Sequence, residues 1–482
     1  MRRILLAAVA AVGYLLAGEP ALAHTSERGF IMLLPTHLYQ IGGTAAVVLS
    51  FALLIVLPPH WLKDGGCRVY TCCGVPWLLV NLLSIAAFIS MIAIILAGFM
   101  GSRDPLANPL PLTLWSLVWV GLTMAHVLVG NLWRYLNPWR GAALLGGQMS
   151  ARLGHPYRPP LMLPKAVATW PAVALLSAFV WLELVYPAPM DPFTLAVLGL
   201  GYAGLTLTGM AVFGAGAWWR AGELFSVFFS IVSRVALFNL AHRHCPQNPR
   251  LCLQLGVPGR ALVAQPALSA SLIAFIIIAL ASVSFDSFSR TFTWFAWNGN
   301  NPLEPPGRSA MIGANSLGLI AAPLALWLAY LSAVVLGSVL SGQRLYATRR
   351  RVNLFVVSII PIAVGYHLAH YLPAFSVDAQ HALKALSDPF ALGWNLLGLS
   401  DFHVRASLLS HHHTIELFWY AQVAIIVIAH VVAVVVAHAL AARDAYVMGT
   451  RLALMLGELP LTVLMAAYTL LGLWLLSTPT AG

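Results

Sequence analysis

Long apolar runs separated by short polar segments recur along almost the whole chain. A helix that crosses the hydrocarbon core of a bilayer needs about 20 apolar residues. Runs of this kind predict ten transmembrane helices, near residues 38–58, 75–100, 112–133, 166–187, 192–213, 262–283, 312–341, 352–373, 414–440 and 454–478. The predicted fold class is an all-α polytopic membrane protein, with residues 24–482 forming a single transmembrane helical domain.

The first residues have the pattern of a cleaved signal peptide. Arg2 and Arg3 precede an apolar stretch, and Ala21-Leu22-Ala23 matches the A-x-A pattern of a cleavage site. We therefore expect residues 1–23 to be absent from the mature protein, which would begin at His24. An α-amino group and an imidazole on one residue form the chelate of copper histidine-brace sites, although any residue can follow a signal peptide.

The basic residues predict the orientation of the helices. With the mature N-terminus outside, eighteen Lys and Arg residues fall in cytoplasmic loops and six in outer loops. This is the bias that the positive-inside rule describes. The sequence thus predicts that both termini lie outside, in a multi-pass protein of the bacterial inner membrane.

One apolar stretch, residues 223–241, is not counted as a span. It contains Arg234, and counting it would reverse every later helix and remove the charge bias. We expect an interfacial or re-entrant helix there, on the cytoplasmic side and anchored by Trp218 and Trp219.

Composition agrees with lipid as the main partner. Hydrophobic residues make up 60% of the chain and charged residues 9%, against about 25% charged in an average soluble domain. The net charge of +11 is spread between the apolar runs instead of forming a patch, which argues against nucleic acid. Most of the 16 Trp residues lie near span ends, as interfacial residues do.

Nine of the sixteen histidines fall on or near the predicted outer face. His367 and His370 share one face of a helix end, and a His triplet precedes the next span across a loop. The candidate ligands for a transition metal are His24, His37, His367, His370, His411, His412 and His413. Imidazole ligands without thiolate favour copper, with haem iron as the alternative. The alternative interpretation is that His411, His412 and His413 are solvated and have no ligand. His367 and His370 would then form hydrogen bonds at the end of their helix.

Two histidines, His126 and His430, fall at similar depth within predicted spans. They are candidate axial ligands of a b-type haem if their helices are neighbours. Two unrelated buried histidines, each hydrogen-bonded to a neighbouring helix, would give the same pattern.

A second group of ligand residues falls on the predicted cytoplasmic face, where thiols stay reduced. His242, His244, Cys245 and Cys252 offer four zinc or copper ligands within eleven residues, although their spacing is not that of a zinc knuckle.

The leading functional hypothesis is an inner-membrane metalloprotein with a periplasm-facing histidine site for redox chemistry or metal handling. A periplasmic metal or electron carrier, or other membrane subunits, would then be its partners. One alternative is a secondary transporter of a metal ion or small solute, built from five plus five helices. The other is a non-catalytic subunit of a larger complex. The sequence has no phosphate-binding loop, nucleophile elbow or H-E-x-x-H motif, so whether the chain is an enzyme stays open.

Overall fold

The computed structural model describes most of the 482-residue chain. The described residues are 36–56, 68–74, 77–154, 157–245, 248–255, 258–265, 267–304, 306–343, 345–409, 411–444, 451–478 and 480. The predicted signal peptide and His24 lie outside them, so the processing of the N-terminus stays a prediction.

The described chain is predominantly helical, with three short strands. The first half contains α3 (Thr36–Val56), β1 (Arg68–Gly74), α4 (Trp77–Met100), α5 (Pro109–Leu112), the π-helix η2 (Thr113–Gly121), α6 (Leu122–Val129), α7 (Trp133–Leu136), α8 (Pro138–Arg152), α9 (Trp170–Leu184), α10 (Pro192–Phe213), α11 (Ala215–Ala221), α12 (Leu224–Val232), η3 (Ser233–Val235) and β2 (Phe238–Cys245). The second half contains β3 (Asn248–Leu255), α13 (Arg260–Val263), α14 (Ala270–Ser289), α15 (Phe292–Trp297), η4 (Arg308–Met311), α16 (Ile312–Leu340), α17 (Leu345–Phe355), η5 (Val356–Ser358), α18 (Ile359–Ser387), η6 (Ala406–Leu409), α19 (His412–Asp444) and α20 (Arg451–Ser477).

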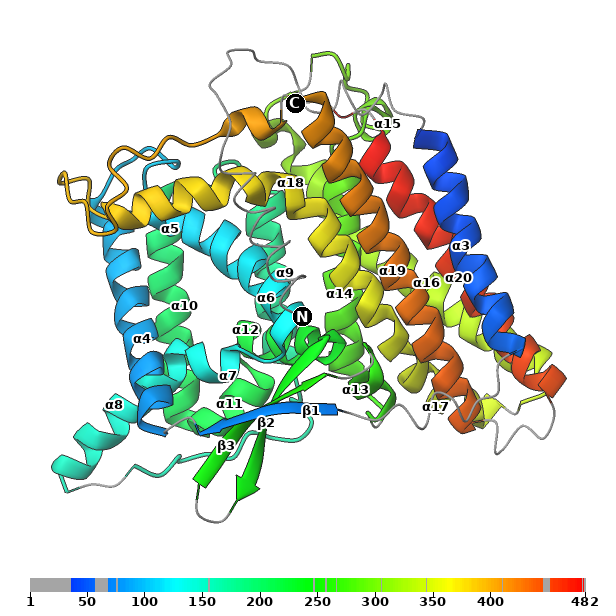
Figure 1. Cartoon of the computed structure of the whole chain (residues 1–482), viewed down its shortest axis with the longest axis horizontal. Coiled ribbons are helices and arrows are strands. Elements are labelled where there is room, and N and C mark those ends of the chain that lie inside the picture. Colours follow the sequence, from blue (N-terminus) through cyan, green and yellow to red (C-terminus); the bar gives the residue numbers. More distant parts are fainter. Residues whose placement is uncertain are drawn as a thin grey trace.

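Eight of the described helical segments are long and apolar enough to cross a membrane, which makes the chain a multi-pass membrane protein. They are Trp77–Met100, Pro109–Val129, Pro192–Phe213, Ala270–Ser289, Arg308–Leu340, Thr348–Ser387, His412–Ala441 and Leu452–Ser477. These long helices run between two ends of the molecule in Figure 1.

The two remaining predicted spans correspond to α3 and α9, which are not among the eight. Helix α3 packs along α19 and α20, as Figure 1 shows. Helix α9 has 15 residues. At 1.5 Å per residue it is about 22 Å long, shorter than the roughly 30 Å hydrocarbon core. The count of ten spans therefore stays a prediction.

Helix α18 is bent in Figure 1 and contains a proline, Pro373, in its interior. The apolar segment to which it belongs has 40 residues. A straight helix of that length would measure about 60 Å, twice the bilayer core. Proline lacks the amide hydrogen and crowds the preceding turn, which kinks a helix. In Figure 1 the part of α18 after the bend runs across the ends of the other helices.

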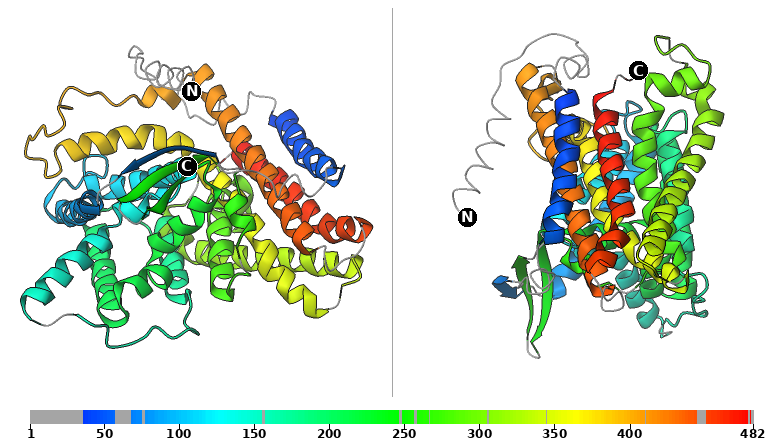
Figure 2. Two further views of the ribbon diagram at one scale, coloured as in Figure 1. Left: turned by 60° about the horizontal axis from the view of Figure 1, so that its bottom comes forward. Right: turned by 90° about the vertical axis from the view of Figure 1, so that its right-hand side faces the viewer.

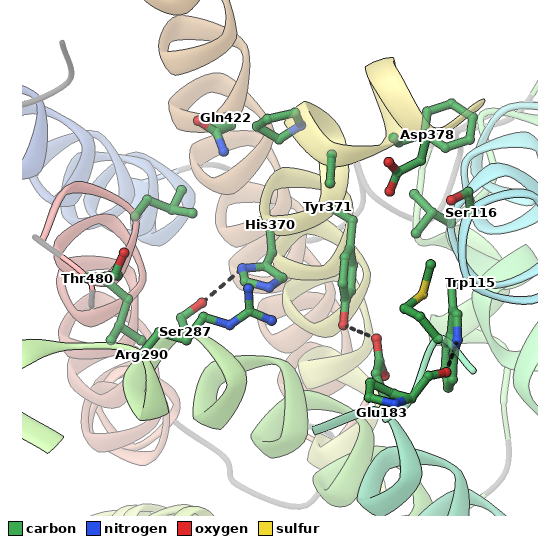
Figure 3. Close-up of a pocket in the computed structure, with 18 of the residues that line it drawn as sticks. Trp115, Ser116, Glu183, Ser287, Arg290, His370, Tyr371, Asp378, Gln422 and Thr480 are labelled. Carbon is green, nitrogen blue, oxygen red and sulfur yellow. Dashed lines mark hydrogen bonds between the residues drawn. The ribbon is translucent and has the colours of Figure 1, made fainter. Parts of the chain in front are cut away.

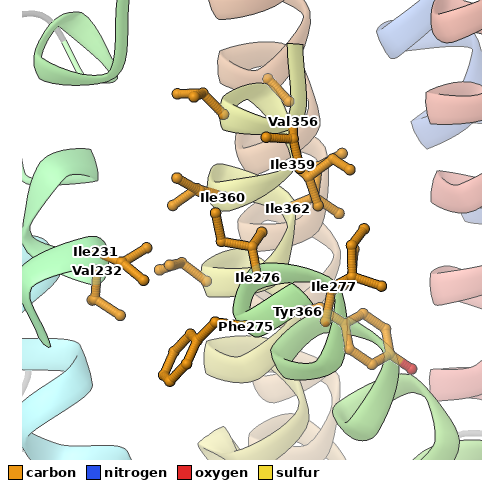
Figure 4. Packing of buried hydrophobic residues seen from close by; sticks show 14 of the residues in the cluster. Ile231, Val232, Phe275, Ile276, Ile277, Val356, Ile359, Ile360, Ile362 and Tyr366 are labelled. Atoms are coloured by element: carbon orange, nitrogen blue, oxygen red, sulfur yellow. The ribbon is translucent and has the colours of Figure 1, made fainter. Parts of the chain in front are cut away.

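The core is formed where α12, α14 and α18 meet. Figure 4 shows Ile231 and Val232 of α12 facing Phe275 and Ile276 of α14, with residues from the start of α18 beside them. These side chains are almost fully excluded from the surface. Many leucines on the outward sides of α4, α10 and α16 are exposed instead, as expected for helices that face lipid.

The interfacial or re-entrant helix expected over residues 223–241 is shorter than predicted. Helix α12 ends at Val232, and residues from Phe238 onward belong to strand β2. Phe228 and Phe229 are buried and contact Trp119 and His126. The apolar side chains of α12 therefore lie against protein within the bundle.

A three-stranded antiparallel sheet, which the sequence analysis did not predict, closes one end of the bundle. Its order is β1-β3-β2, with Cys72 opposite Cys252 and Ala241 opposite Cys252. Figure 1 shows the sheet below the helices. We call this the sheet end of the molecule.

Polar caps fix where several helices begin. Asp191 Oδ2 accepts a hydrogen bond of 2.8 Å from the backbone N–H of Thr194, and Pro192 occupies the first position of α10. Glu223 accepts bonds from the N–H groups of Phe225 and Ser226 at the start of α12. Such caps satisfy N–H groups that have no partner within the helix.

Candidate functional site

The described structure contains a cavity of about 300 Å³ at the end of the bundle opposite the sheet. Figure 3 shows its polar lining, which comes from η2, α9, α14, α18 and α19 and from residues that follow α20. The charged or hydrogen-bonding residues at its wall are Trp115, Ser116, Glu183, Ser287, Arg290, Arg308, His370, Tyr371, Asp378, Gln422, Thr478 and Thr480. We call this cavity the pocket, and this end of the molecule the pocket end.

An ion-pair network is the most distinctive feature of the pocket. His370 Nε2 lies 2.7 Å from Asp286 Oδ2, and Arg290 Nη2 lies 2.7 Å from Asp286 Oδ1. The Asp286 side chain is 3% exposed, whereas that of Arg290 is 43% exposed. The buried carboxylate thus holds two basic side chains at the pocket wall, and Arg290 keeps part of its surface free of protein.

Hydrogen bonding extends this network into the bundle. Ser287 Oγ is 3.0 Å from His370 Nδ1, and the Tyr366 hydroxyl donates to Ser287 Oγ at 3.0 Å. The Asp286 carboxylate can only accept, so His370 Nε2 carries the proton of that hydrogen bond. Nδ1 of a neutral His370 then accepts a hydrogen bond from the Ser287 hydroxyl. This tautomer is assigned from the hydrogen-bond network. His370 therefore connects the pocket, through hydrogen bonds, to the buried groups behind it.

A second carboxyl group stands on the opposite wall. Glu183 Oε1 accepts from the Tyr371 hydroxyl at 2.7 Å, as Figure 3 shows. Arg308 Nη1 donates to the backbone oxygens of Glu183 and Tyr186 at the end of α9. The pocket therefore has carboxyl groups as well as guanidinium groups at its wall.

Two irregular helices shape the pocket. The π-helix η2 contributes Trp115, Ser116 and Val120 to the wall, and the bend of α18 contributes Pro373 and Phe375. π-Helical turns widen a helix locally and are frequent at functional sites. Both irregularities open space between helices that would otherwise pack closely.

The predicted His367–His370 pair does not present two nitrogens to one point. His367 Nε2–H donates a hydrogen bond of 3.0 Å to the Trp119 backbone oxygen, and the His367 ring lies edge-on to that of Trp119. The side chain of His370 turns instead to Asp286 and Ser287. The two rings share a helix face in sequence, but protein hydrogen bonds hold them in separate surroundings.

Two members of the predicted triplet, His412 and His413, lie close to Glu416 instead of grouping with His411. His412, His413 and Glu416 each offer one ligand atom within 4.8 Å of the others. Both imidazoles are exposed, and so are His411 and His37. The structure brings Tyr39, two residues after His37, against the rings of Trp419 and Tyr420, so α3 lies beside the first turns of α19.

The predicted haem ligands have protein partners. His126 Nε2 accepts from the Trp133 backbone N–H at 2.9 Å, and His126 Nδ1 bonds to the Leu122 oxygen at 2.6 Å. His430 Nδ1 bonds to the Ile426 oxygen, whereas its Nε2 has no hydrogen-bond partner among the described residues. In this conformation His126 has no nitrogen left for iron, so its geometry does not fit axial ligation.

The predicted cytoplasmic ligand group falls in the sheet. The backbone register puts His242 opposite Leu251, His244 opposite Pro249 and Cys245 opposite Asn248. The side chains of this group, including Cys252, lie outside the described part of the structure, so the metal prediction there is untested.

Most of the pocket was not predicted from the sequence. Asp286 and Glu183 were not among the candidate site residues. Arg290 and Tyr371 were not singled out. The one available signal was Asp286 with Arg290 at i and i+4, a spacing that lets opposite charges pair on a helix.

No family model, no curated protein and no solved structure matches this chain.

Proposed function

We propose that the chain is a secondary transporter whose pocket binds a small polar solute. The observation that carries this proposal is an ion-pair network among membrane helices, in which the buried Asp286 pairs with two residues of the pocket wall, His370 and Arg290. Ionisable side chains are costly at membrane depth and mark solute or ion pathways in such proteins. This favours the transporter alternative over the metal site predicted at His367 and His370.

The size of the pocket limits the solute. Ligand pockets have volumes of about 300 to 1,000 Å³, and this one, at about 300 Å³, is at the lower bound. The solute is therefore a small molecule of about the size of an amino acid. A lipid chain or a large cofactor does not fit.

The charges at the wall indicate which groups the solute carries. The partly exposed guanidinium of Arg290 can bind a carboxylate through two parallel N–H groups. Glu183 and Asp378, elsewhere on the wall, can accept hydrogen bonds from an ammonium group. A zwitterion satisfies both sides, so we propose a small zwitterionic solute.

Binding to the purified full-length protein tests the proposal. Isothermal titration with small zwitterionic amino acids, simple carboxylates and inorganic phosphate should give heat for a zwitterion. Arg290→Gln should weaken that binding by about tenfold or more, because it removes a charge-assisted hydrogen bond of about 1.5–3 kcal/mol. Glu183→Gln should also weaken it, because the amide replaces one of the two oxygens that can accept from the ammonium group. Lys384→Gln, which removes an exposed charge at the far end of α18, is the matched control.

Uptake then separates transport from binding alone. Proteoliposomes should accumulate the radiolabelled zwitterion that binds, and the Arg290→Gln protein should not. Binding of no zwitterion, or equal binding by the Arg290→Gln and Lys384→Gln proteins, would refute the assignment of the pocket.

A second candidate function, the transition-metal site of the sequence analysis, is favoured by one observation. His412, His413 and Glu416 offer three ligand atoms within 4.8 Å of one another. Two imidazoles and a carboxylate are a ligand set that copper accepts, and His411 is adjacent in the chain. Such a surface site would serve metal handling or redox chemistry with a soluble metal or electron carrier.

Metal analysis decides this second candidate. The purified protein, dialysed against Cu²⁺, should retain about one copper ion, and the triple variant His412→Ala, His413→Ala, Glu416→Ala should retain none. His403→Ala, another exposed outer histidine in the sequence-based orientation, is the control. Equal copper retention by the triple variant and the control would exclude this site.

A further inference from the structure

A buried histidine–glutamate pair lies at the sheet end of α19 and α20. His438 Nδ1 is 3.0 Å from Glu458 Oε2, and the two side chains are 5% and 4% exposed. In Figure 1 these parts of α19 and α20 lie near α17, far from the pocket end.

Both members of the pair have an atom without a hydrogen-bond partner among the described residues. These atoms are His438 Nε2 and Glu458 Oε1. Buried polar atoms are almost always satisfied, and an exception indicates a bound water, ion or proton. The unpartnered atoms are therefore positions where a proton or a water molecule can be bound.

The charges around the pair favour a proton over a metal ion. Among the described residues, the charge that acts on Glu458 from outside the pair is that of Arg351 on α17, which is 1% exposed. Arg351 Nη1 donates to Ser338 and Ser341 of α16. The negative charge of an ionised Glu458 and the positive charge of Arg351 cancel, so these two residues and a neutral His438 together carry no net charge. One added proton then gives the three residues a net charge of plus one. A neighbouring guanidinium would repel a metal cation.

Buried polar groups continue from the pair toward the pocket. His430 lies eight residues before His438 on α19, about 12 Å along the helix, and its Nε2 is also unpartnered. Ala429, its neighbour, contacts Gly365 of α18, which places His430 at the level of Tyr366. Tyr366 in turn donates to Ser287, the partner of His370.

A parallel set of hydroxyl groups lies on α20. Tyr468, ten residues after Glu458 and about 15 Å along the helix, forms a 2.5 Å hydrogen bond with Ser284 of α14. Two threonines of the same helix are also buried: Thr462, between Glu458 and Tyr468, and Thr469, directly after Tyr468. The intervals are too long for direct hydrogen bonds or for a single bridging water, so proton movement along them would require a chain of several bound waters.

We propose that His438 and Glu458 form a proton-binding site, the sheet-end terminus of a proton pathway that reaches His370 through His430 and Tyr366. This inference rests on the proposed transport function and names the proton as the coupled ion. A proton from the aqueous phase at the sheet end binds the pair and leaves it for His430. One N–H or O–H bond breaks for each one that forms, and no oxidant or other reactant takes part.

Infrared spectroscopy tests the proton site without knowledge of the solute. The purified full-length protein is moved from mildly alkaline to mildly acidic buffer, and the difference spectrum is recorded for carboxyl and imidazole bands. Glu458→Gln should remove one carboxyl component, and His438→Gln should shift that component, because the pair shares its proton. Glu458→Asp should restore a carboxyl component, and His403→Gln should leave the spectrum unchanged. Identical difference spectra for wild type and Glu458→Gln would overturn the proposal.

Proteoliposomes test the coupling. With an imposed pH gradient, Glu458→Gln should reduce gradient-driven accumulation of a zwitterion by about a hundredfold, as expected when a positioned proton-transfer group is lost. Binding in the pocket, measured by titration, should stay within about twofold of wild type. Wild-type accumulation by the variant would contradict the pathway while the pocket assignment stands. Failure of any zwitterion to bind would refute the pocket, and the infrared result would still decide the proton site.

Discussion

Gly337 of α16 lies directly against the backbone of Gly457 on α20. A Cβ atom added at Gly337 would stand 2.3 Å from the Gly457 carbonyl oxygen, which cannot move aside as a flexible side chain can. Small residues let membrane helices approach closely, and van der Waals contact between them then drives association. This contact lies one residue from Ser338, which holds Arg351 beside the buried histidine–glutamate pair.

We expect Gly337→Ala to destabilise the protein because α16 and α20 must separate. Overpacking typically costs about 1–3 kcal/mol. Because the added Cβ meets a backbone oxygen at 2.3 Å, we expect a cost in the upper part of that range, above the roughly 1 kcal/mol that alanine gains over glycine in helix propensity. Gly313→Ala on the same helix is the control, since nothing lies within 4 Å of its added Cβ. Thermal unfolding in detergent should show a lower midpoint for Gly337→Ala only; equal midpoints would mean that the two helices are not tightly apposed.

The network at the pocket makes a second prediction. Asp286→Ala should destabilise the protein more than His370→Ala, because it leaves both Arg290 and His370 without their carboxylate. Removal of one partner from a buried ion pair costs about 3–5 kcal/mol. In a double-mutant cycle the two positions should couple by about 1–3 kcal/mol. Strictly additive effects on the free energy of unfolding would show that the 2.7 Å contact is not formed.

The cap of α10 predicts a pH effect. Hydrogen bonds from the side chain and backbone of Thr194 hold the pKa of Asp191 below its ordinary value. A carboxyl group with a lowered folded pKa stabilises the folded state above its unfolded pKa of about 3.9, and this contribution is lost as the pH falls through the folded value.

Asp191→Asn keeps a capping side chain that cannot titrate. The contribution of this cap to the free energy of unfolding should therefore stay constant in acid in the Asn variant, whereas in wild type it decreases. Asp191→Ala should lose about 1 kcal/mol at neutral pH. Unfolding midpoints of wild type and both variants, followed from neutral pH into acid, provide the measurement. A wild type and an Asn variant with the same acid profile would contradict the cap assignment.

Orientation is open to a direct test. Reporter fusions after Asp401 should be active outside the cytoplasm, and fusions within the β2–β3 segment should be active inside, because the positive-inside bias puts the pocket end outside. N-terminal sequencing of the purified protein should begin at His24. A cytoplasmic reporter after Asp401 would reverse the direction of the proposed proton pathway and remove the periplasmic setting of the metal site.

Apolar periodicity predicted most of the long helices well. The run predicted near 75–100 became α4, Trp77–Met100, and the run near 414–440 lies within α19, His412–Asp444. Such helices satisfy their own backbone hydrogen bonds, so local sequence largely decides where they start and end. The predicted span 352–373 ends at Pro373, which lies inside α18. The missing amide hydrogen of a proline is likewise a local property that the sequence shows directly.

The sheet and the pocket depend on contacts that local sequence does not contain. Strand β1 pairs with β3 across most of the first half of the chain, and His370 meets Asp286 from 84 residues away. The sequence correctly put His367 and His370 on one face of a helix but could not tell which neighbouring helix each ring would meet. For the same reason, two histidines at similar depth, His126 and His430, gave no information on whether their rings face each other.

The strand order also constrains how the protein is made. Strand β3 is central and pairs with both β1 and β2, so β1 leaves the ribosome long before any partner exists. Residues 68–74 must wait at the membrane surface while α4 to α12 are inserted, and only the arrival of residues 248–255 lets them pair. A chain interrupted before that point would keep an open strand edge, the kind of surface on which chaperones act and from which aggregates grow.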